Sequence, residues 1–217
     1  AMYRDWSGRL TGRLLRMYPR EDAQRFIEVV ASRLTKTDTE GSGGMAAEVR
    51  IDLQAPEPLW WARDPVRVDW SPTASGQTTT VQSPGSFPAA PVITIYGATV
   101  SGKHLVNPRL VNESTGHVLE LALTLQQGQA VRVYPVHAGL DEIPEEAAAY
   151  QYAGTMAEHV PWTEPMPSPV SVLTAVGEEW TFDGFLLLEG ENVIRFEDDV
   201  SGAHRATIVF EWRPAWA

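Results

Sequence analysis

The stretch that decides the fold class is SPGSFPAAPVITIYGATVSGKHLVNPRLVNESTGHVLELALTLQQGQAVRVYP, residues 83–135. Within it, residues 92–96 read Val-Ile-Thr-Ile-Tyr, and β-branched and aromatic residues favour strands. Pro91 precedes this run and Gly97 follows it, and both residue types oppose a helix. The run is therefore predicted to be a strand.

Three further strands are predicted in the same stretch. Apolar and polar residues mostly alternate over residues 106–111 and again over residues 117–125. The loop between these runs ends in Gly116, which can take the positive φ that such turns often need, so a hairpin is expected. A second turn at residues 126–129 leads into residues 130–134, whose alternation puts both valines on one face. We expect the four strands to form one meander.

The rest of the C-terminal part also favours short strands. After Tyr134 the pattern loosens into a long excursion, in which residues 144–149 could form a turn of helix. The prolines of residues 161–169 exclude a helix and any central strand. Strands are expected again at residues 170–176, 180–188, 192–196 and 206–212. Short antiparallel strands without intervening helices predict a mainly β fold, an antiparallel β-sandwich.

The N-terminal part is predicted to be a smaller α+β segment. From Asp5 to Met17 apolar residues recur at helical spacing until Pro19, which favours a short amphipathic helix. Strands at residues 26–34 and 46–53 are then expected to form a hairpin around a glycine-rich loop.

A linker is expected between the two parts. Residues 69–84 are rich in Ser, Thr and Gly, and they contain one possible strand at residues 77–82. We place the boundary near Pro72. This gives an N-terminal assembly domain over residues 1–72 and a C-terminal β-sandwich over residues 73–217.

Several motifs, taken in their order along residues 45–217, resemble the distal tail proteins of siphophages. They are Ala-Pro-Glu-Pro-Leu-Trp-Trp at 55–61, Gly-x-Phe-Pro-Ala-x-Pro at 85–91, Pro-x-Leu-Val-Asn-x-x-Thr-Gly at 108–116 and Phe-Leu-Leu-Leu-Glu-Gly-Glu-Asn at 185–192. The chain also finishes with an alternating strand that is rich in tryptophan. Each motif alone is a common turn pattern, so the order carries the resemblance.

The resemblance implies a galectin-like jelly roll in the C-terminal part and a structural, non-enzymatic role. Such a protein joins the tail tube to the adhesion apparatus of a phage baseplate, in a virion tail assembled in the bacterial cytoplasm. Its implied partners are other copies in a six-fold ring, the tail tube, the tail hub and a receptor-binding protein. Trp60 and Trp61 are the implied assembly contacts. The family's opening strands are absent here, so the chain is expected to be either a fragment or a reduced member.

Composition and charge exclude several classes of function. The formal net charge is −11, and residues 76–217 supply all of it, with 6 basic and 17 acidic residues. A surface of that sign repels phosphates, so no nucleic-acid partner is expected. The chain has no cysteine for a disulfide, a thiolate metal site or a cysteine nucleophile. It also shows no run of about 20 apolar residues, so no membrane segment is expected.

One motif resembles a phosphate-binding loop. Residues 97–103 fit G-x-x-x-x-G-K, but His104 stands where Ser or Thr would hold magnesium. Pro108 would stop the helix whose N-terminus faces the phosphates. A β-turn with a solvated Lys103 is expected instead, and no cofactor.

No catalytic site is expected, and metal binding is the weaker interpretation of the scattered histidines. His137 and His159 share the long excursion with Asp141 and Glu142, and these side chains could converge on a cation. Solvated side chains on an acidic loop are the simpler interpretation, as is a turn for the acidic residues 197–199. The sequence shows neither a Ser/His/Asp order nor a nucleophile elbow.

The alternative function is a carbohydrate-binding β-sandwich module. Most tryptophans in a sandwich belong to the core. Trp162, on the proline-rich loop, is the one placed to form an exposed platform for sugar stacking.

Overall fold

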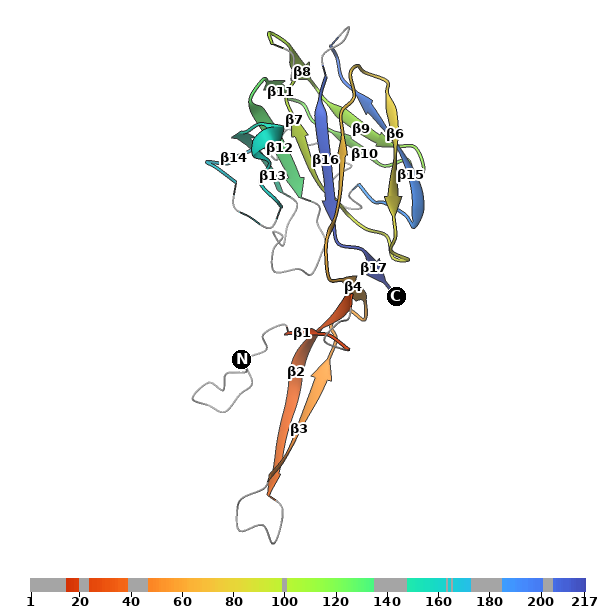
Figure 1. The fold of residues 1–217 in the computed structure, drawn as a ribbon, viewed down its shortest axis with the longest axis vertical. Coiled ribbons are helices and arrows are strands. Elements are labelled where there is room, and N and C mark those ends of the chain that lie inside the picture. Colours follow the sequence, from red (N-terminus) through yellow and green to blue (C-terminus); the bar gives the residue numbers. More distant parts are fainter. Residues whose placement is uncertain are drawn as a thin grey trace. The chain divides into compact units, whose positions relative to one another are not determined.

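The computed structural model describes most of the chain as strands connected by turns (Figure 1). The described residues are 15–19, 24–38, 47–98, 101–134, 148–162, 164, 166–172, 185–200 and 205–217. They divide into two compact units: the first comprises the residues up to Arg63 together with Ala217, and the second runs from Asp64 to Trp216. Their one helical element is a short 3-10 turn, η1 (Met156–Glu158). No helix among these residues has the length and apolar character needed to span a membrane.

The second unit contains two antiparallel sheets and a two-stranded ribbon. The six-stranded sheet has the order β14 (Val170–Ser171), β13 (Ala148–Ala153), β12 (Gln129–Tyr134), β7 (Val92–Tyr96), β16 (Thr207–Trp212) and β5 (Val66–Trp70). The four-stranded sheet has the order β10 (Val118–Glu120), β9 (Arg109–Asn112), β15 (Gly190–Glu197) and β6 (Thr78–Ser83). The ribbon consists of β8 (His104–Val106) and β11 (Thr124–Gln126), and β17 (Ala215–Trp216) follows β16.

The core lies between the two sheets, which confirms the predicted β-sandwich. Each sheet contributes alternate side chains, as the period of a strand requires. From the four-stranded sheet these are Val81, Leu110, Leu119, Ile194 and Phe196, and from the six-stranded sheet they include Ile93, Ile95, Val131, Val133, Ile208 and Phe210. The two valines predicted to share one face of residues 130–134 therefore do so.

The predicted single meander is wrong. The expected strand at 106–111 is divided into β8 and β9 at Asn107, whose φ is 49°, and Pro108, which has no N–H to donate. The partner run at 117–125 is likewise divided into β10 and β11. The β9–β10 hairpin is confirmed, with Gly116 at φ 80° in its turn. Because the chain leaves one sheet and later returns, β7 pairs with β12 and not with β8.

The first unit is a small sheet extended by a long hairpin. It contains β1 (Leu15–Met17), β2 (Arg25–Asp38), β3 (Ala47–Gln54) and β4 (Trp60–Ala62). The predicted hairpin is confirmed, since β2 and β3 pair from Val30 opposite Gln54 to Asp38 opposite Ala47. The last residues of the predicted helix form β1, so the helix is wrong there. Residues 5–14 lie outside the described residues.

The second unit starts before the linker predicted from the sequence. Residues of β5 pair with β16 from Val66 opposite Trp212 to Trp70 opposite Ile208, so this strand belongs to the sandwich. The compact unit accordingly begins at Asp64, earlier than Pro72. The possible strand at 77–82 is confirmed as β6, and those at 192–196 and 206–212 as β15 and β16.

The remaining strand and helix predictions fall partly on residues outside the described ones. Only the start of the strand expected at 170–176 is described, as β14. The turn of helix considered at residues 144–149 does not include Ala148 and Ala149, which belong to β13. Residues 144–147 lie outside the described residues.

A shortened chain that begins at Asp64 should unfold in one cooperative transition, because it keeps every strand of both sheets. A chain that begins at residue 76 loses β5 and the edge contact of Trp70 with Phe196, whose ring centroids lie 6.4 Å apart. We expect this shorter chain to be less stable by about 3 kcal/mol or more. Urea unfolding of both chains measures the difference, and equal midpoints would contradict the assignment of β5 to the sandwich.

Candidate functional site

The hairpin of the first unit presents large apolar side chains to solvent. Ile51 and Leu53 on β3 are 42% and 43% exposed, and as alternate residues of one strand they lie on the same face. Leu53 lies opposite Ala31 of β2. A two-stranded ribbon without a second layer is only marginally stable in water. This face is therefore suited to being covered by another chain.

The edges of the same hairpin are open within the described part of the chain. Among those residues β3 pairs only with β2, so its other edge has no strand partner. On the far edge of β2, β1 covers only Ile27 to Val29. Open strand edges of this length are sites where a further strand can add.

The two tryptophans predicted as assembly contacts lie at the base of this hairpin. In β4, Trp61 lies opposite Phe26 of β2 and Trp60 lies opposite Ile27. Trp61 is 8% exposed, whereas Trp60 is half-buried. Of the two, Trp60 therefore has the more accessible indole.

A segment that we call the strap, residues 154–162, covers the outer face of the six-stranded sheet. This face is the one turned away from the sandwich core. Trp162 at the end of the strap packs with Val92, Tyr134 and Ala148 and is 3% exposed. The predicted exposure of Trp162 is therefore wrong, because the outer face of the sheet is apolar enough to bury the indole.

The strap is held by a buried arginine. Arg132 of β12 is fully buried and donates hydrogen bonds to the strap carbonyls of Val160 and Pro161. Its Nε donates to Thr94 Oγ1 at 3.1 Å. A guanidinium is suited to this position because its donors form a planar fork that can serve several acceptors at once.

A second contact joins the strap to the sheet through His159. Burial, together with the hydrogen bond to Tyr152, raises the pKa of Tyr96 far above its usual range, so its hydroxyl stays protonated. That hydroxyl lies 2.7 Å from His159 Nδ1, and the two atoms share a hydrogen bond. The other ring nitrogen of His159, Nε2, lies 3.3 Å from a carboxylate oxygen of Glu211.

The asparagines of two sequence motifs meet inside the sandwich. Asn112 donates to the carbonyl of Leu186 at 2.8 Å and to Asn192 Oδ1 at 3.3 Å. Asn192 donates to the carbonyl of Leu188 at 2.8 Å and accepts from its N–H at 2.9 Å. Both asparagines are fully buried, so these motif positions stabilise loops of the sandwich.

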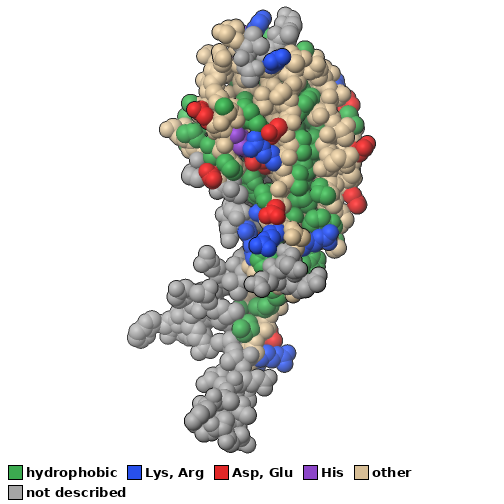
Figure 2. Space-filling view, viewed as in Figure 1, with side chains coloured by type: hydrophobic (Ala, Val, Ile, Leu, Met, Phe, Trp, Pro, Cys, Tyr) green, Lys and Arg blue, Asp and Glu red, His purple; other side chains and the backbone are tan. Residues whose placement is uncertain are grey.

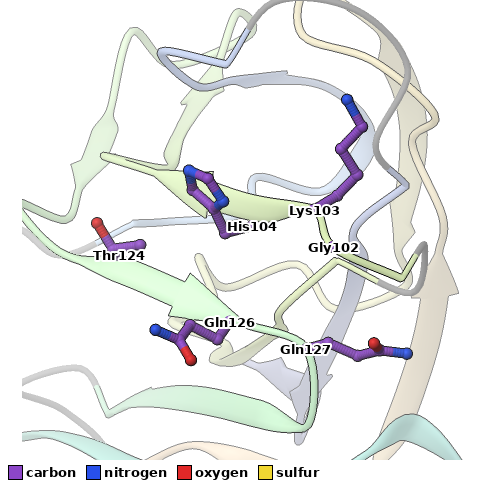
Figure 3. A pocket seen from close by; sticks show the side chains of 6 residues that line it. All are labelled: Gly102, Lys103, His104, Thr124, Gln126 and Gln127. Carbon is purple, nitrogen blue, oxygen red and sulfur yellow. The ribbon is translucent and has the colours of Figure 1, made fainter.

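The phosphate-loop motif leads into a strand. The predicted turn is present at Ser101 and Gly102, and His104 then begins β8, earlier than the predicted strand start at Val106. An open cavity of about 470 Å³ lies beside this turn, on the ribbon formed by β8 and β11 (Figure 3). Its lining residues are Gly102, Lys103, His104, Thr124, Gln126 and Gln127.

Of the residues considered for a cation, only His159 is described by the structure. His137, Asp141 and Glu142 lie outside the described residues, and His159 is engaged with Tyr96. The described residues contain no group of three or more His, Asp or Glu side chains that could hold a metal ion. The turn at residues 197–199 includes Asp199, which accepts a hydrogen bond from Asn107 at 2.6 Å.

The comparison with solved structures gives a likeness of fold. The chain is similar to the crystal structure of the SPP1 Dit protein, described as a paradigm of the hub adsorption apparatus in phages that infect Gram-positive bacteria. The TM-score is 0.53 at 13% sequence identity, over 88% of this chain and 60% of that chain. The chain thus spans 60% of the length of that structure. No protein-family model and no curated protein sequence matches it.

Replacing Arg132 by Met should loosen the strap. Two strap carbonyls and Thr94 would lose their donor, and each buried group left without a partner costs about 1–3 kcal/mol. Quenching of Trp162 by acrylamide, measured as the difference from Trp162→Phe, should increase. Arg109→Met is the matched control, because Arg109 is part-exposed and pairs with Glu197 in a surface ion pair that contributes about 0–1 kcal/mol. Unchanged quenching in Arg132→Met would show that Arg132 does not hold the strap.

Proposed function

We propose that this chain is a structural, non-enzymatic component of a phage tail tip that joins the tail tube to the adhesion apparatus. The observation that carries the proposal is the shared fold with SPP1 Dit over 88% of the chain. The order of the sequence motifs along the chain points to the same class of protein. The two lines of argument are separate, since at 13% identity the fold likeness does not depend on those motifs.

The hairpin supports the part of the proposal that concerns assembly. Its exposed Ile51 and Leu53 and the open edge of β3 provide an apolar face and a row of backbone groups for another copy. Contacts of this kind between unlike surfaces of neighbouring copies close a ring when the rotation is right. We propose that such contacts form a ring, with six copies as in the family that the motifs resemble.

The sandwich supports the part of the proposal that concerns docking. Its two sheets enclose a buried apolar core, and residues 76–217 hold 6 basic and 17 acidic residues. On the face shown in Figure 2, acidic side chains lie apart from one another, some at the edge and some near the middle beside basic ones, and are not gathered into one site. A packed body of this kind can carry the tail hub and a receptor-binding protein without chemistry of its own.

The alternative function, glycan binding on Trp162, is not favoured at that residue. An indole that is 3% exposed offers no face for a sugar unless the strap leaves the sheet.

The assembly proposal predicts an oligomer at about 100 μM, a concentration at which an association with a Kd of ~1 μM is nearly complete. Ile51→Asn with Leu53→Asn should shift the sedimentation coefficient toward the monomer, and Trp60→Ala should do so in part. Trp61→Ala should mainly lower the melting temperature, because Trp61 is buried. The distribution should change little with salt, since apolar contact depends little on screening.

Val170→Asn is the matched control for these variants. Val170 is 65% exposed on β14 of the sandwich, so the change removes a comparable exposed apolar side chain from the other unit. A monomer at 100 μM, or an equal shift in the control, would contradict assembly through the hairpin.

A further inference from the structure

The cavity beside β8 and β11 is lined mostly by residues with polar groups, and the backbone that carries them is fixed in place. Figure 3 shows His104 and Gln126 in the middle of the ribbon, Thr124 at one end, and Lys103 and Gln127 at the other. His104 lies directly opposite Gln126 in the strand pairing. Thr124 is two residues from Gln126 in the same strand, so these three side chains share one face of the ribbon. All three are exposed.

The opposite face of the ribbon fixes it to the sandwich. Leu105 and Leu125 are fully buried in the core and lie opposite each other. The end of the ribbon is fixed as well, because Gly97 approaches the Gln126 carbonyl so closely that a Cβ would collide with it. The Gly97 N–H also donates to the Gln129 carbonyl at 2.8 Å. The polar side chains thus project from a backbone that is already ordered.

The lining side chains are free to bind a ligand. Within the described part of the chain, the side chains of Lys103, His104, Thr124, Gln126 and Gln127 make no hydrogen bond or ion pair with another residue. Amide, hydroxyl and neutral imidazole groups each combine donors and acceptors, and the ammonium adds donors. This mixture matches a ligand whose groups also donate and accept, as sugar hydroxyls do. The lining contains no Trp, Tyr or Phe ring for stacking and no carboxylate.

We propose that this cavity binds a neutral carbohydrate. Its volume of about 470 Å³ lies within the range of small-ligand pockets, about 300–1,000 Å³. The net charge of −11 disfavours acidic glycans, although Lys103 lies in the lining. Because the cavity is open and has no stacking platform, each copy binds weakly, and useful avidity requires several copies or a repeating ligand. The site is separate from the hairpin and from Trp162.

The test is an array of neutral oligosaccharides built from hexoses, deoxyhexoses and N-acetylhexosamines, with matched acidic derivatives. Display on a surface compensates for weak single contacts. The full chain should bind at least one neutral oligosaccharide, and Gln126→Ala and Thr124→Val should each reduce that signal about tenfold. Trp162→Phe should keep the signal. No neutral hit, an equal signal for acidic derivatives, or a hit that survives both cavity variants would overturn the proposal.

Lysine labelling locates the bound sugar. The chain has two lysines, Lys36 on β2 and Lys103 in the cavity. Saturating amounts of the neutral oligosaccharide identified on the array should slow acetylation of Lys103 severalfold and leave Lys36 unchanged, as measured by mass spectrometry. Equal protection of both lysines, or of neither, would overturn the assignment to this cavity. The cavity variants should not change the sedimentation behaviour, so the failure of ring assembly and of sugar binding are distinguishable.

Discussion

The three central strands β7, β12 and β16 are buried on both faces, and the arrangement of the second unit depends on this. One face of these strands contributes to the core between the sheets, with Ile93, Val131 and Ile208 among its side chains. The other face carries Tyr96, Ala130 and Val209, which also pack away from solvent. A sheet whose central strands are buried on both sides needs a cover on each. The four-stranded sheet is one cover and the strap is the other.

Arg132 determines where the strap, the second cover, lies on the sheet. It is fully buried without a carboxylate partner among the described residues, and its charge is solvated by carbonyl and hydroxyl oxygens. Burying a charge is costly, and apolar replacements often give equal stability. We therefore attribute to Arg132 the position of the strap more than the stability of the sheet. The His159 contact with Tyr96 defines the same position from a neighbouring strand.

The first unit presents the opposite situation. Its hairpin has strands of 14 and 8 residues but no second layer over Ile51 and Leu53 within the described residues. In the described part of a single chain, both the apolar face and the strand edge are left in water. The sandwich has a buried core, whereas the hairpin has an exposed apolar face and an open strand edge. This difference is the physical basis for proposing that the hairpin assembles with other copies and the sandwich carries partners.

Strand positions and the fold class could be predicted from the sequence because alternation records which face is buried. The passage of the chain from the β8–β11 ribbon to the four-stranded sheet could not be predicted, because the break at Asn107 and Pro108 lies inside a continuous alternating run. The signal for β5 was present, since Val66 and Val68 alternate with charged residues, but the Ser/Thr-rich stretch after it favoured a later boundary.

Burial of Trp162 and of the strap depends on residues distant in sequence. A tryptophan on a proline-rich loop is expected at the surface. It is buried here because Val92 of β7 and Tyr134 of β12 pack against it on the outer face of the sheet. Arg132 gave no local signal either, since an arginine on an alternating strand usually faces solvent. The polar lining of the cavity arises from the pairing of β8 with β11, which the predicted meander did not contain.

The central claim is that another copy of the chain completes the hairpin. Amide hydrogen exchange, followed by mass spectrometry from dilute to concentrated protein, tests it most directly. The account predicts that the amides of β3 exchange more slowly as the concentration rises, because their open edge becomes paired, while those of β7 and β12 stay equally protected throughout. Fast exchange of β3 at every concentration, including one at which the protein is an oligomer, would contradict the account.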